Sequence, residues 1–164
     1  MHDMEEKLKN YTELRQKAKE LYDSFESVRC PALNNEFVNF TSEGFTHILY
    51  RTKKSERDKS TQIMRFELLA KAKKLIELTT TYQEHEEYYR TVERRRFKRK
   101  VLEQESINDW GLIGVIDNFR IKVVIRKIGN GQNQFHSVIP AWRTKYYKDI
   151  KIVSNTTKGN VADD

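Results

Sequence analysis

The sequence predicts an α+β fold in which N-terminal helices pack on a small antiparallel sheet of about four strands. Two observations carry this prediction. Apolar residues recur at three- and four-residue steps through the first part of the chain, which is the period of an amphipathic helix. Near the other end, runs rich in Val, Ile and Phe at residues 110–116, 119–128 and 134–140 are separated by Asp-Asn and Gly-Asn-Gly turn signals, a pattern typical of consecutive antiparallel strands.

The composition narrows the class of partner. A chain of 164 residues is long enough for one domain with its own core. Its 31 Lys and Arg exceed its 24 Asp and Glu, and the net charge of +7 makes nucleic acid the leading partner class. An anionic membrane surface, an acidic protein partner, or charge that merely favours solubility are the alternatives.

Two features that the sequence lacks exclude other classes of protein. The single cysteine, Cys30, excludes an internal disulfide framework and a cysteine metal cluster. No apolar run approaches the roughly 20 residues that a membrane helix needs, and the first residues lack the apolar segment of a signal peptide. We therefore expect a cytoplasmic protein without a membrane partner.

The chain divides into three predicted parts. Residues 1–30 are expected to form an N-terminal helix, 31–153 the main domain and 154–164 a flexible polar tail. The helix ends before Cys30, because the following proline disfavours helix in that residue. Its apolar stripe either packs on the domain, which is the simpler interpretation, or docks a partner such as an antitoxin.

The middle of the chain alternates short elements. Residues 36–40 predict a short strand, and residues 45–50 a second strand with Phe45, His47 and Leu49 on one face. A charged loop follows, and then an amphipathic helix over 60–78 that should pack on the sheet. His47 is either a satisfied structural histidine or a general acid–base group, since its ordinary pKa lies near neutrality.

Residues 82–106 are ambiguous. Glu86 and Arg90 form an i,i+4 pair, which favours a helix. Residues 94–100 hold six basic side chains around Phe97. This run is either a solvated connector or helix face, or a set of phosphate contacts in which Phe97 stacks on a base.

Strand parity predicts a cationic face on the last strands. If residues 129–133 form a five-residue loop, Arg126 pairs with His136, and a shift of one residue would exchange His136 for Ser137. One face is then apolar, and the other is a strip made of Arg120, Lys122, Val124, Arg126 and His136. Such a strip suits a phosphodiester, because arginine binds phosphate bidentately and stabilises charge in a transition state.

The motifs that other chemistries need are missing from the sequence. It contains no His-Glu-x-x-His or Cys-x-x-Cys pattern, no phosphate-binding Gly-x-x-x-x-Gly-Lys loop and no Gly-x-Ser-x-Gly elbow. Nucleotide hydrolysis and acyl transfer therefore lose support, and neither a metal site nor a cofactor is expected. RNA brings its own nucleophile, the 2′-hydroxyl, so a ribonuclease needs only a base, an acid and cations.

Three segments resemble a known superfamily. They are Phe-Thr-His-Ile-Leu-Tyr-Arg at 45–51, Val-Val-Ile-Arg-Lys at 123–127 and Phe-His-Ser-Val-Ile-Pro at 135–140. Together they resemble the barnase–EndoU–colicin–RelE superfamily of small ribonucleases, and its phage and mobile-element branch most of all, over about residues 37–142. The resemblance implies helices preceding a four-stranded antiparallel sheet and metal-independent cleavage of RNA, often tRNA or ribosome-bound RNA, by toxins or effectors. RNA and an antitoxin or immunity protein would be the partners.

The resemblance also implies roles for individual residues. His47 would be the general base or acid, Arg126 and Lys127 would hold the phosphate, and Ser137 would contact the phosphate or ribose. Arg51 and Lys54 would be helpers in substrate binding. Apart from the resemblance, strand parity adds Arg120, Lys122 and His136 to the predicted substrate-binding residues, and Trp142 completes that set. The alternatives are a nucleic-acid-binding module or regulator without catalysis, which the same charge supports, and an adaptor that docks a protein through its N-terminal helix.

Overall fold

The computed structural model describes residues 2–141 of the chain. These residues form four α-helices, a short 3-10 turn, a six-stranded sheet and a two-stranded sheet. The helices are α1 (His2–Lys9), α2 (Tyr11–Phe25), α3 (Ser42–Leu49) and α4 (Lys59–Leu78), and the turn η1 is Pro31–Leu33. The strands are β1 (Ser27–Cys30), β2 (Glu36–Asn39), β3 (Tyr50–Thr52), β4 (Ser55–Glu56), β5 (Glu84–Arg96), β6 (Arg99–Ile116), β7 (Phe119–Ile128) and β8 (Asn133–Pro140).

The large sheet is mixed. Its strand order is β1-β2-β8-β7-β6-β5, with β2 parallel to β8 and every other neighbouring pair antiparallel. The α+β class is confirmed, but the prediction of a small antiparallel sheet of about four strands is wrong. Two additional strands explain the difference: β1 has four residues in a segment predicted as helix, and β5 lies in the segment whose structure was ambiguous.

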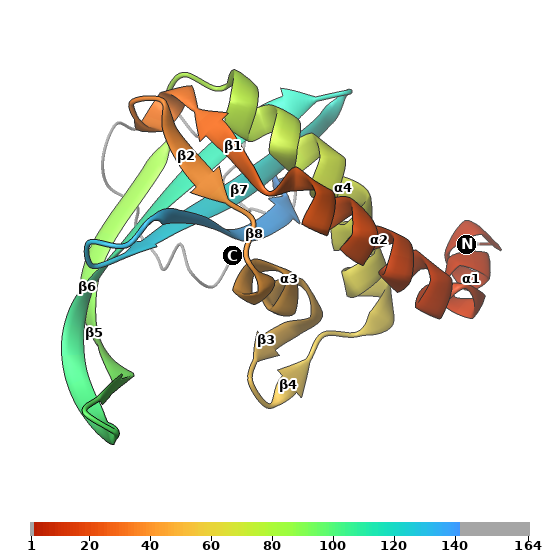
Figure 1. The fold of residues 1–164 in the computed structure, drawn as a ribbon. Coiled ribbons are helices and arrows are strands. Elements are labelled where there is room, and N and C mark those ends of the chain that lie inside the picture. Colours follow the sequence, from red (N-terminus) through yellow and green to blue (C-terminus); the bar gives the residue numbers. More distant parts are fainter. Residues whose placement is uncertain (1, 142–164) are drawn as a thin grey trace.

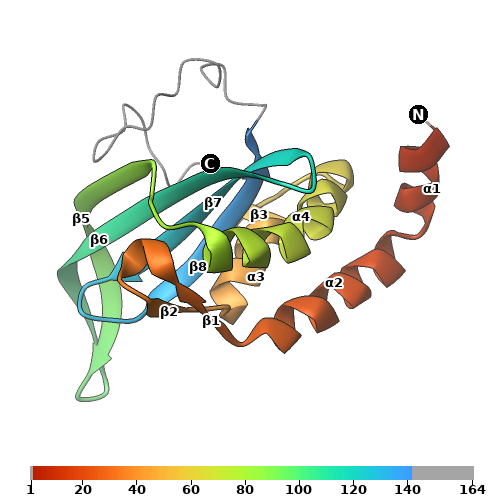
Figure 2. The same ribbon diagram turned by 90° about the horizontal axis from the view of Figure 1, so that it is seen from above.

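The helices α2 and α4 lie on the same side of the sheet, as Figures 1 and 2 show together. The stripe of α2 packs inward, with Tyr11, Ala18, Tyr22 and Phe25 buried. The helix pattern is interrupted at Asn10, where the backbone leaves helical geometry and separates α1 from α2. None of the helices within residues 2–141 is long and apolar enough to cross a membrane.

Several predicted elements are confirmed. The helix predicted over residues 60–78 is α4, the strand predicted over residues 36–40 is β2, and the three consecutive antiparallel strands are β6, β7 and β8. The Asp-Asn turn joins β6 to β7, with positive φ angles of 49° at Asp117 and 66° at Asn118. This is the geometry of a two-residue hairpin turn, which Asp and Asn tolerate better than most residues.

The segment that carries His47 is a helix, so the prediction of a strand over residues 45–50 is wrong. Gly44, Phe45, Ile48 and Leu49 are buried, and their spacing is that of one helical face. The sequence also alternates with period two over this short stretch, so the pattern fits both structures. Packing against the aromatic core decides in favour of the helix.

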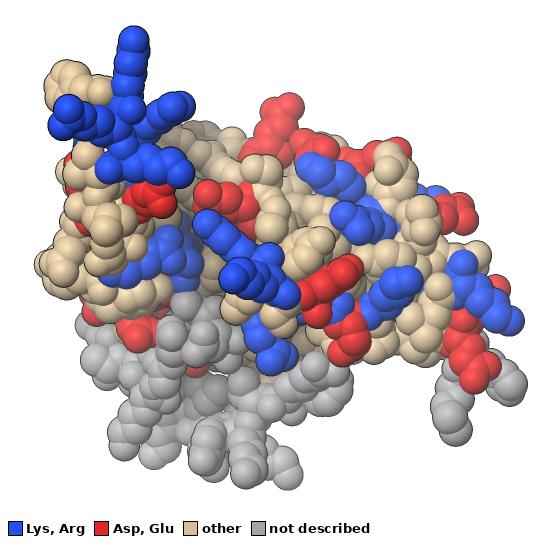
Figure 3. All heavy atoms as spheres, turned by 90° about the horizontal axis from the view of Figure 1, so that it is seen from below, with Lys and Arg blue, Asp and Glu red and all other residues tan. Residues whose placement is uncertain are grey.

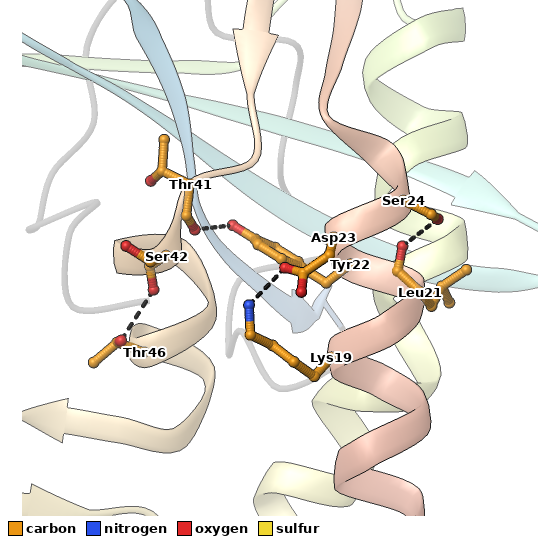
Figure 4. A network of polar contacts seen from close by, with 8 residues as sticks. All are labelled: Lys19, Leu21, Tyr22, Asp23, Ser24, Thr41, Ser42 and Thr46. Carbon is orange, nitrogen blue, oxygen red and sulfur yellow. Dashed lines mark hydrogen bonds and ion pairs between the residues drawn. The ribbon is translucent and has the colours of Figure 1, made fainter.

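The start of α3 is held by Tyr22, a fully buried side chain of α2. Its hydroxyl donates a 2.6 Å hydrogen bond to the carbonyl oxygen of Thr41, the residue that precedes α3 (Figure 4). Gly44 lets both Tyr22 and β8 approach α3 closely, since a Cβ there would clash with the Tyr22 hydroxyl and would lie 2.6 Å from the carbonyl oxygen of Phe135. These contacts hold α3 against α2 and β8, and they therefore set the position of His47.

The ambiguous segment folds into a long hairpin of β5 and β6, so the helix favoured by the Glu86–Arg90 spacing is wrong. Its two-residue turn is Phe97–Lys98, with positive φ angles of 49° and 63°. Pairing of β6 with β7 begins at Ile107, so residues 99–106 pair with β5 on one side. Figure 1 shows this end of the hairpin curving away from the rest of the fold.

The register between β7 and β8 also differs from the prediction. Val124 pairs with Ser137, whereas Ile125 pairs with Phe135 and Arg126 with Gln134. A β-bulge therefore lies at His136, and the predicted pairing of Arg126 with His136 is wrong. The extra residue turns the side chain of His136 toward α3 rather than leaving it in a regular ladder.

Candidate functional site

A pocket of about 360 Å³ opens where α3 and the β3–β4 hairpin face the sheet. It is lined from α3, β3, β5, β7 and β8, so segments distant in sequence build it together. The titratable side chains on its wall are Glu43, His47, Tyr50, Arg51, Lys53, Arg90, Arg126 and His136. Four of these side chains are basic at any physiological pH, and three of them, Arg51, Lys53 and Arg90, outnumber Glu43 even though Arg126 is paired with Asp109, so the pocket favours an anion.

Two histidines stack in this pocket. The rings of His47 on α3 and His136 on β8 lie with centroids 4.2 Å apart and planes 24° from parallel. Both side chains are half-buried, and each leaves part of its edge on the pocket wall. A separation of 4.2 Å leaves no room for a phosphate between the rings, so a bound phosphate would lie beside the stacked pair.

Arg57, which follows the β3–β4 hairpin, contacts both the backbone and the ring of His47. Its Nε donates to the carbonyl oxygen of His47 at 3.0 Å, and its Nη2 lies 3.3 Å from His47 Nε2. Because a guanidinium can only donate, Nε2 must accept, which places the proton of His47 on Nδ1. Burial lowers the pKa of His47 to about 2, and the neighbouring His136 and Arg57 act in the same direction. His47 is therefore a neutral imidazole.

Arg126 is tied into a buried network on the wall of the pocket. Its Nε and Nη2 donate to the two carboxylate oxygens of Asp109 at 2.8 and 3.0 Å, and Nη2 also contacts the hydroxyl of Tyr88 at 3.0 Å. Burial disfavours the charge of Arg126, but Asp109 outweighs that effect and raises its pKa. Burial also raises the pKa of Tyr88 to about 12, with Asp109 acting in the same direction.

The predicted cationic strip does not exist as one surface. Lys122 is buried and forms an ion pair with Glu84 at 2.5 Å, and Arg126 is neutralised by Asp109. Arg120 is exposed near the start of β7, outside the pocket lining. Strand parity placed these side chains on one face but could not show that the neighbouring strands carry acids opposite them.

Two other predicted residues do not line the pocket. Ser137 is fully buried, and its hydroxyl accepts a 3.0 Å hydrogen bond from Nη1 of Arg65 on α4. Lys127 pairs with Asn108 on β6 and follows Arg126, so it points to the opposite face of the sheet. Ser137 therefore takes part in fixing α4 to β8 beneath the histidine pair.

The structure brings together His47, Arg51, Arg126 and His136 from the predicted set. Lys54 is exposed in the β3–β4 turn beside Lys53, which does line the pocket, and Trp142 lies outside the described residues. The residues that sequence reasoning missed are Lys53, Arg57, Arg65 and Arg90. Their only signal was positive charge, and the charged loop at residues 51–59 held two of them.

Comparison with known proteins adds no relative: no protein-family model, curated protein or solved structure matches this chain. The resemblance to small ribonucleases therefore stays a prediction. Within residues 2–141, no group of three or more His, Cys, Asp or Glu side chains is placed to hold a metal ion.

The chemistry available to the pocket follows from its charges. His47 is fixed in one tautomer and one orientation, and its ring supports that of His136. The His136 ring also lies on the pocket wall, stacked on that of His47. Arg51 and Lys53 belong to the β3–β4 hairpin and Arg90 to β5, so an anion in the pocket would meet positive charge from two elements. The arrangement suits proton transfer next to a bound phosphate.

Proposed function

We propose that this protein is an endoribonuclease that cleaves RNA by attack of the 2′-hydroxyl on the adjacent phosphorus. The observation that carries the proposal is the stacked pair of His47 and His136 in a pocket lined by Arg51, Lys53 and Arg90. An imidazole next to phosphate-binding cations is what this reaction requires, because RNA supplies the nucleophile.

In the proposed reaction His136 takes the proton of the 2′-hydroxyl. The 2′-oxygen then bonds to phosphorus, the bond to the 5′-oxygen breaks, and the departing 5′-oxygen takes a proton from water in the open pocket. The products are a 2′,3′-cyclic phosphate and a 5′-hydroxyl. Arg51 and Lys53 hold the phosphate and stabilise the charge that develops on its oxygens.

Neutral His47 has a different proposed role. Its Nε2 is occupied by Arg57 and its ring lies against His136, so it orients the reacting imidazole. With His47 neutral, the rings also do not repel each other when His136 takes up a proton. His47 is therefore a positioning residue in this proposal, rather than the general base or acid that the resemblance implies.

The test is cleavage of labelled cellular RNA by the purified protein in EDTA. We expect His136→Gln to lower the rate by about 10²-fold, the usual effect of losing one acid–base group. His47→Phe keeps a ring beneath His136 and should retain most of the activity, whereas His47→Ala should not. His85→Phe is the matched control, because His85 stacks on Trp110 away from the pocket.

The cleavage assays test the proposed function and the roles of the two histidines separately. If wild type leaves tRNA, mRNA and ribosomes intact where a control ribonuclease cleaves them, the proposed function is wrong. If His47→Phe is as inactive as His136→Gln, His47 takes part in proton transfer itself and the assignment of roles must be reversed.

A second candidate function is RNA binding without cleavage. The observation that favours it is the cationic rim of the pocket, in which Arg51, Lys53 and Arg90 would bind phosphate whether or not the histidines react. It predicts salt-sensitive binding of RNA that returns intact from the complex.

A further inference from the structure

The free end of the β5–β6 hairpin carries a dense positive charge. We call residues 91–104 the arm. They contain six basic side chains and two acidic ones, Glu93 and Glu103. Figure 3 shows the Lys and Arg side chains gathered at the tip of the hairpin, at the upper left corner of that face. The proposed chemistry in the pocket does not require this charge.

The positions of the charges at the tip destabilise the hairpin. Arg95 pairs directly with Lys100 across the two strands, and Arg96 pairs directly with Arg99. Like charges in directly opposed positions repel each other. Arg96 has Glu103 nearby to offset this, but within residues 2–141 Arg95 and Arg99 form no ion pair. A bound polyanion would relieve this repulsion.

The turn itself presents an aromatic ring to solvent. Phe97 is 98% exposed and has a φ angle of 49°, a conformation that bulky residues rarely adopt. Asn and Gly fit such a turn far better, and neither is present in it. An exposed phenylalanine among arginines suits stacking on an unpaired base, because every base has a flat face to offer.

The arm leads into the pocket. Arg126 pairs with Asp109, and Asp109 pairs with Glu86, so all three point to one face of the sheet. The even-numbered residues of β5 continue this face, which places Arg90 on the pocket wall and Arg94 and Arg96 beyond it. Arg94 binds Glu105, and Arg96 binds Glu103, so both guanidinium groups are held on this face.

We propose that the arm binds the single-stranded RNA that flanks the cleaved phosphodiester, with one unpaired base stacked on Phe97 and the phosphates on the arm's basic side chains. This inference rests on the proposed function, because it makes the arm an extension of the substrate site. At about 3.3 Å per residue, the seven steps from Arg90 to Phe97 cover roughly 23 Å. At about 3.4 Å per stacked nucleotide, that length corresponds to about seven nucleotides.

The experiment compares RNA length and the arm in binding assays. His136→Gln is used throughout so that the RNA survives, and fluorescent single-stranded RNAs of about 12 and about 4 nucleotides bracket the expected span. In the arm-deleted variant, residues 91–104 are replaced by Asn-Gly, which joins Arg90 to Glu105 through a two-residue turn. The paired residues 107–128 stay unchanged, so the fold should persist, and thermal unfolding checks this.

We expect the arm-deleted variant to bind the longer RNA about 100-fold more weakly and the shorter RNA unchanged. Phe97→Ala should weaken binding of the longer RNA about 10-fold, and Phe97→Trp should preserve it, because stacking tolerates either ring. The dependence of log affinity on log salt should become shallower by roughly 0.7 for each phosphate contact that is lost.

The outcomes separate this proposal from the proposed function. If wild type cleaves RNA but the arm-deleted variant binds the longer RNA as well as its parent, the inference about the arm is wrong and the proposed function stands. If binding depends on the arm but wild type never cleaves RNA, the proposed function is wrong and the arm remains an RNA-binding element. Arm-dependent binding to anionic lipid vesicles without arm-dependent binding of RNA would overturn the inference.

Discussion

The two halves of β6 lie in very different surroundings. Residues 107–116 pair with β5 on one side and β7 on the other, and Leu112 from this half belongs to the buried core. Residues 99–106 pair with β5 on one side and carry Leu102, which is 72% exposed. One continuous strand thus supports the fold at one end and extends into solvent at the other.

The two halves of β6 also differ in how their charged side chains are paired. In the packed half, the buried carboxylate of Asp109 is matched by Arg126 and Tyr88, so the charge is neutralised inside the molecule. In the free half, basic residues oppose basic residues across the strands. Stability governs the first arrangement, and binding of an external anion would explain the second.

The largest expected effect on stability comes from the buried acid of β6. Asp109→Ala leaves the charge of Arg126 without its buried partner and should lower the free energy of unfolding by about 3–5 kcal/mol. Glu103→Ala, on the same strand but in the free half, should change it little, because the ion pairs of Glu103 are open to solvent. Chemical denaturation of both variants measures the contrast, and similar losses would contradict it.

A smaller effect is expected from two leucines of the same strand. Leu112→Ala removes a fully buried side chain and should cost about 2–5 kcal/mol. Leu102→Ala should alter the free energy of unfolding by less than about 0.5 kcal/mol. Thermal unfolding of the pair provides the measurement. A large loss for Leu102→Ala would mean that the free half packs against something in solution.

The smallest effect concerns the turn of the arm. Phe97→Asn with Lys98→Gly gives the turn the residues that its positive φ angles favour, so the hairpin should become more stable by about 0.5–1 kcal/mol. Slower amide hydrogen exchange in β5 near the tip would report this gain. The same variant should bind RNA more weakly, and a gain in both properties would show that Phe97 serves no ligand.

The sequence predicted the elements whose signals are local. The Asp-Asn turn, the β-branched runs of β7 and β8 and the period of α4 each needed no knowledge of distant residues. The β5–β6 hairpin was missed because Phe97–Lys98 is an unusual pair for a two-residue turn and because the Glu86–Arg90 spacing also fits a helix.

The candidate site was predicted only in part, because several of its contacts join residues that are distant in the sequence. Strand parity predicts the sheet face on which Arg126 lies. It does not predict that Asp109, on the neighbouring strand, is its partner. The bulge that turns His136 toward His47 depends on one extra residue in β8, and no residue type in that strand marks it. Arg57 reaches His47 through a tertiary contact, for which the sequence has no local signal.

The alternating geometry of the arm leaves its length open to change during evolution. Residues 99–104 are joined to the domain through their partners in β5, so insertions near the tip leave the core and the histidine pair in place. Adding two residues to each strand preserves the side on which every arginine lies, whereas adding one to each would reverse it. A lineage could therefore lengthen or shorten this projection in even steps and acquire new target preferences while its reaction chemistry is inherited unaltered.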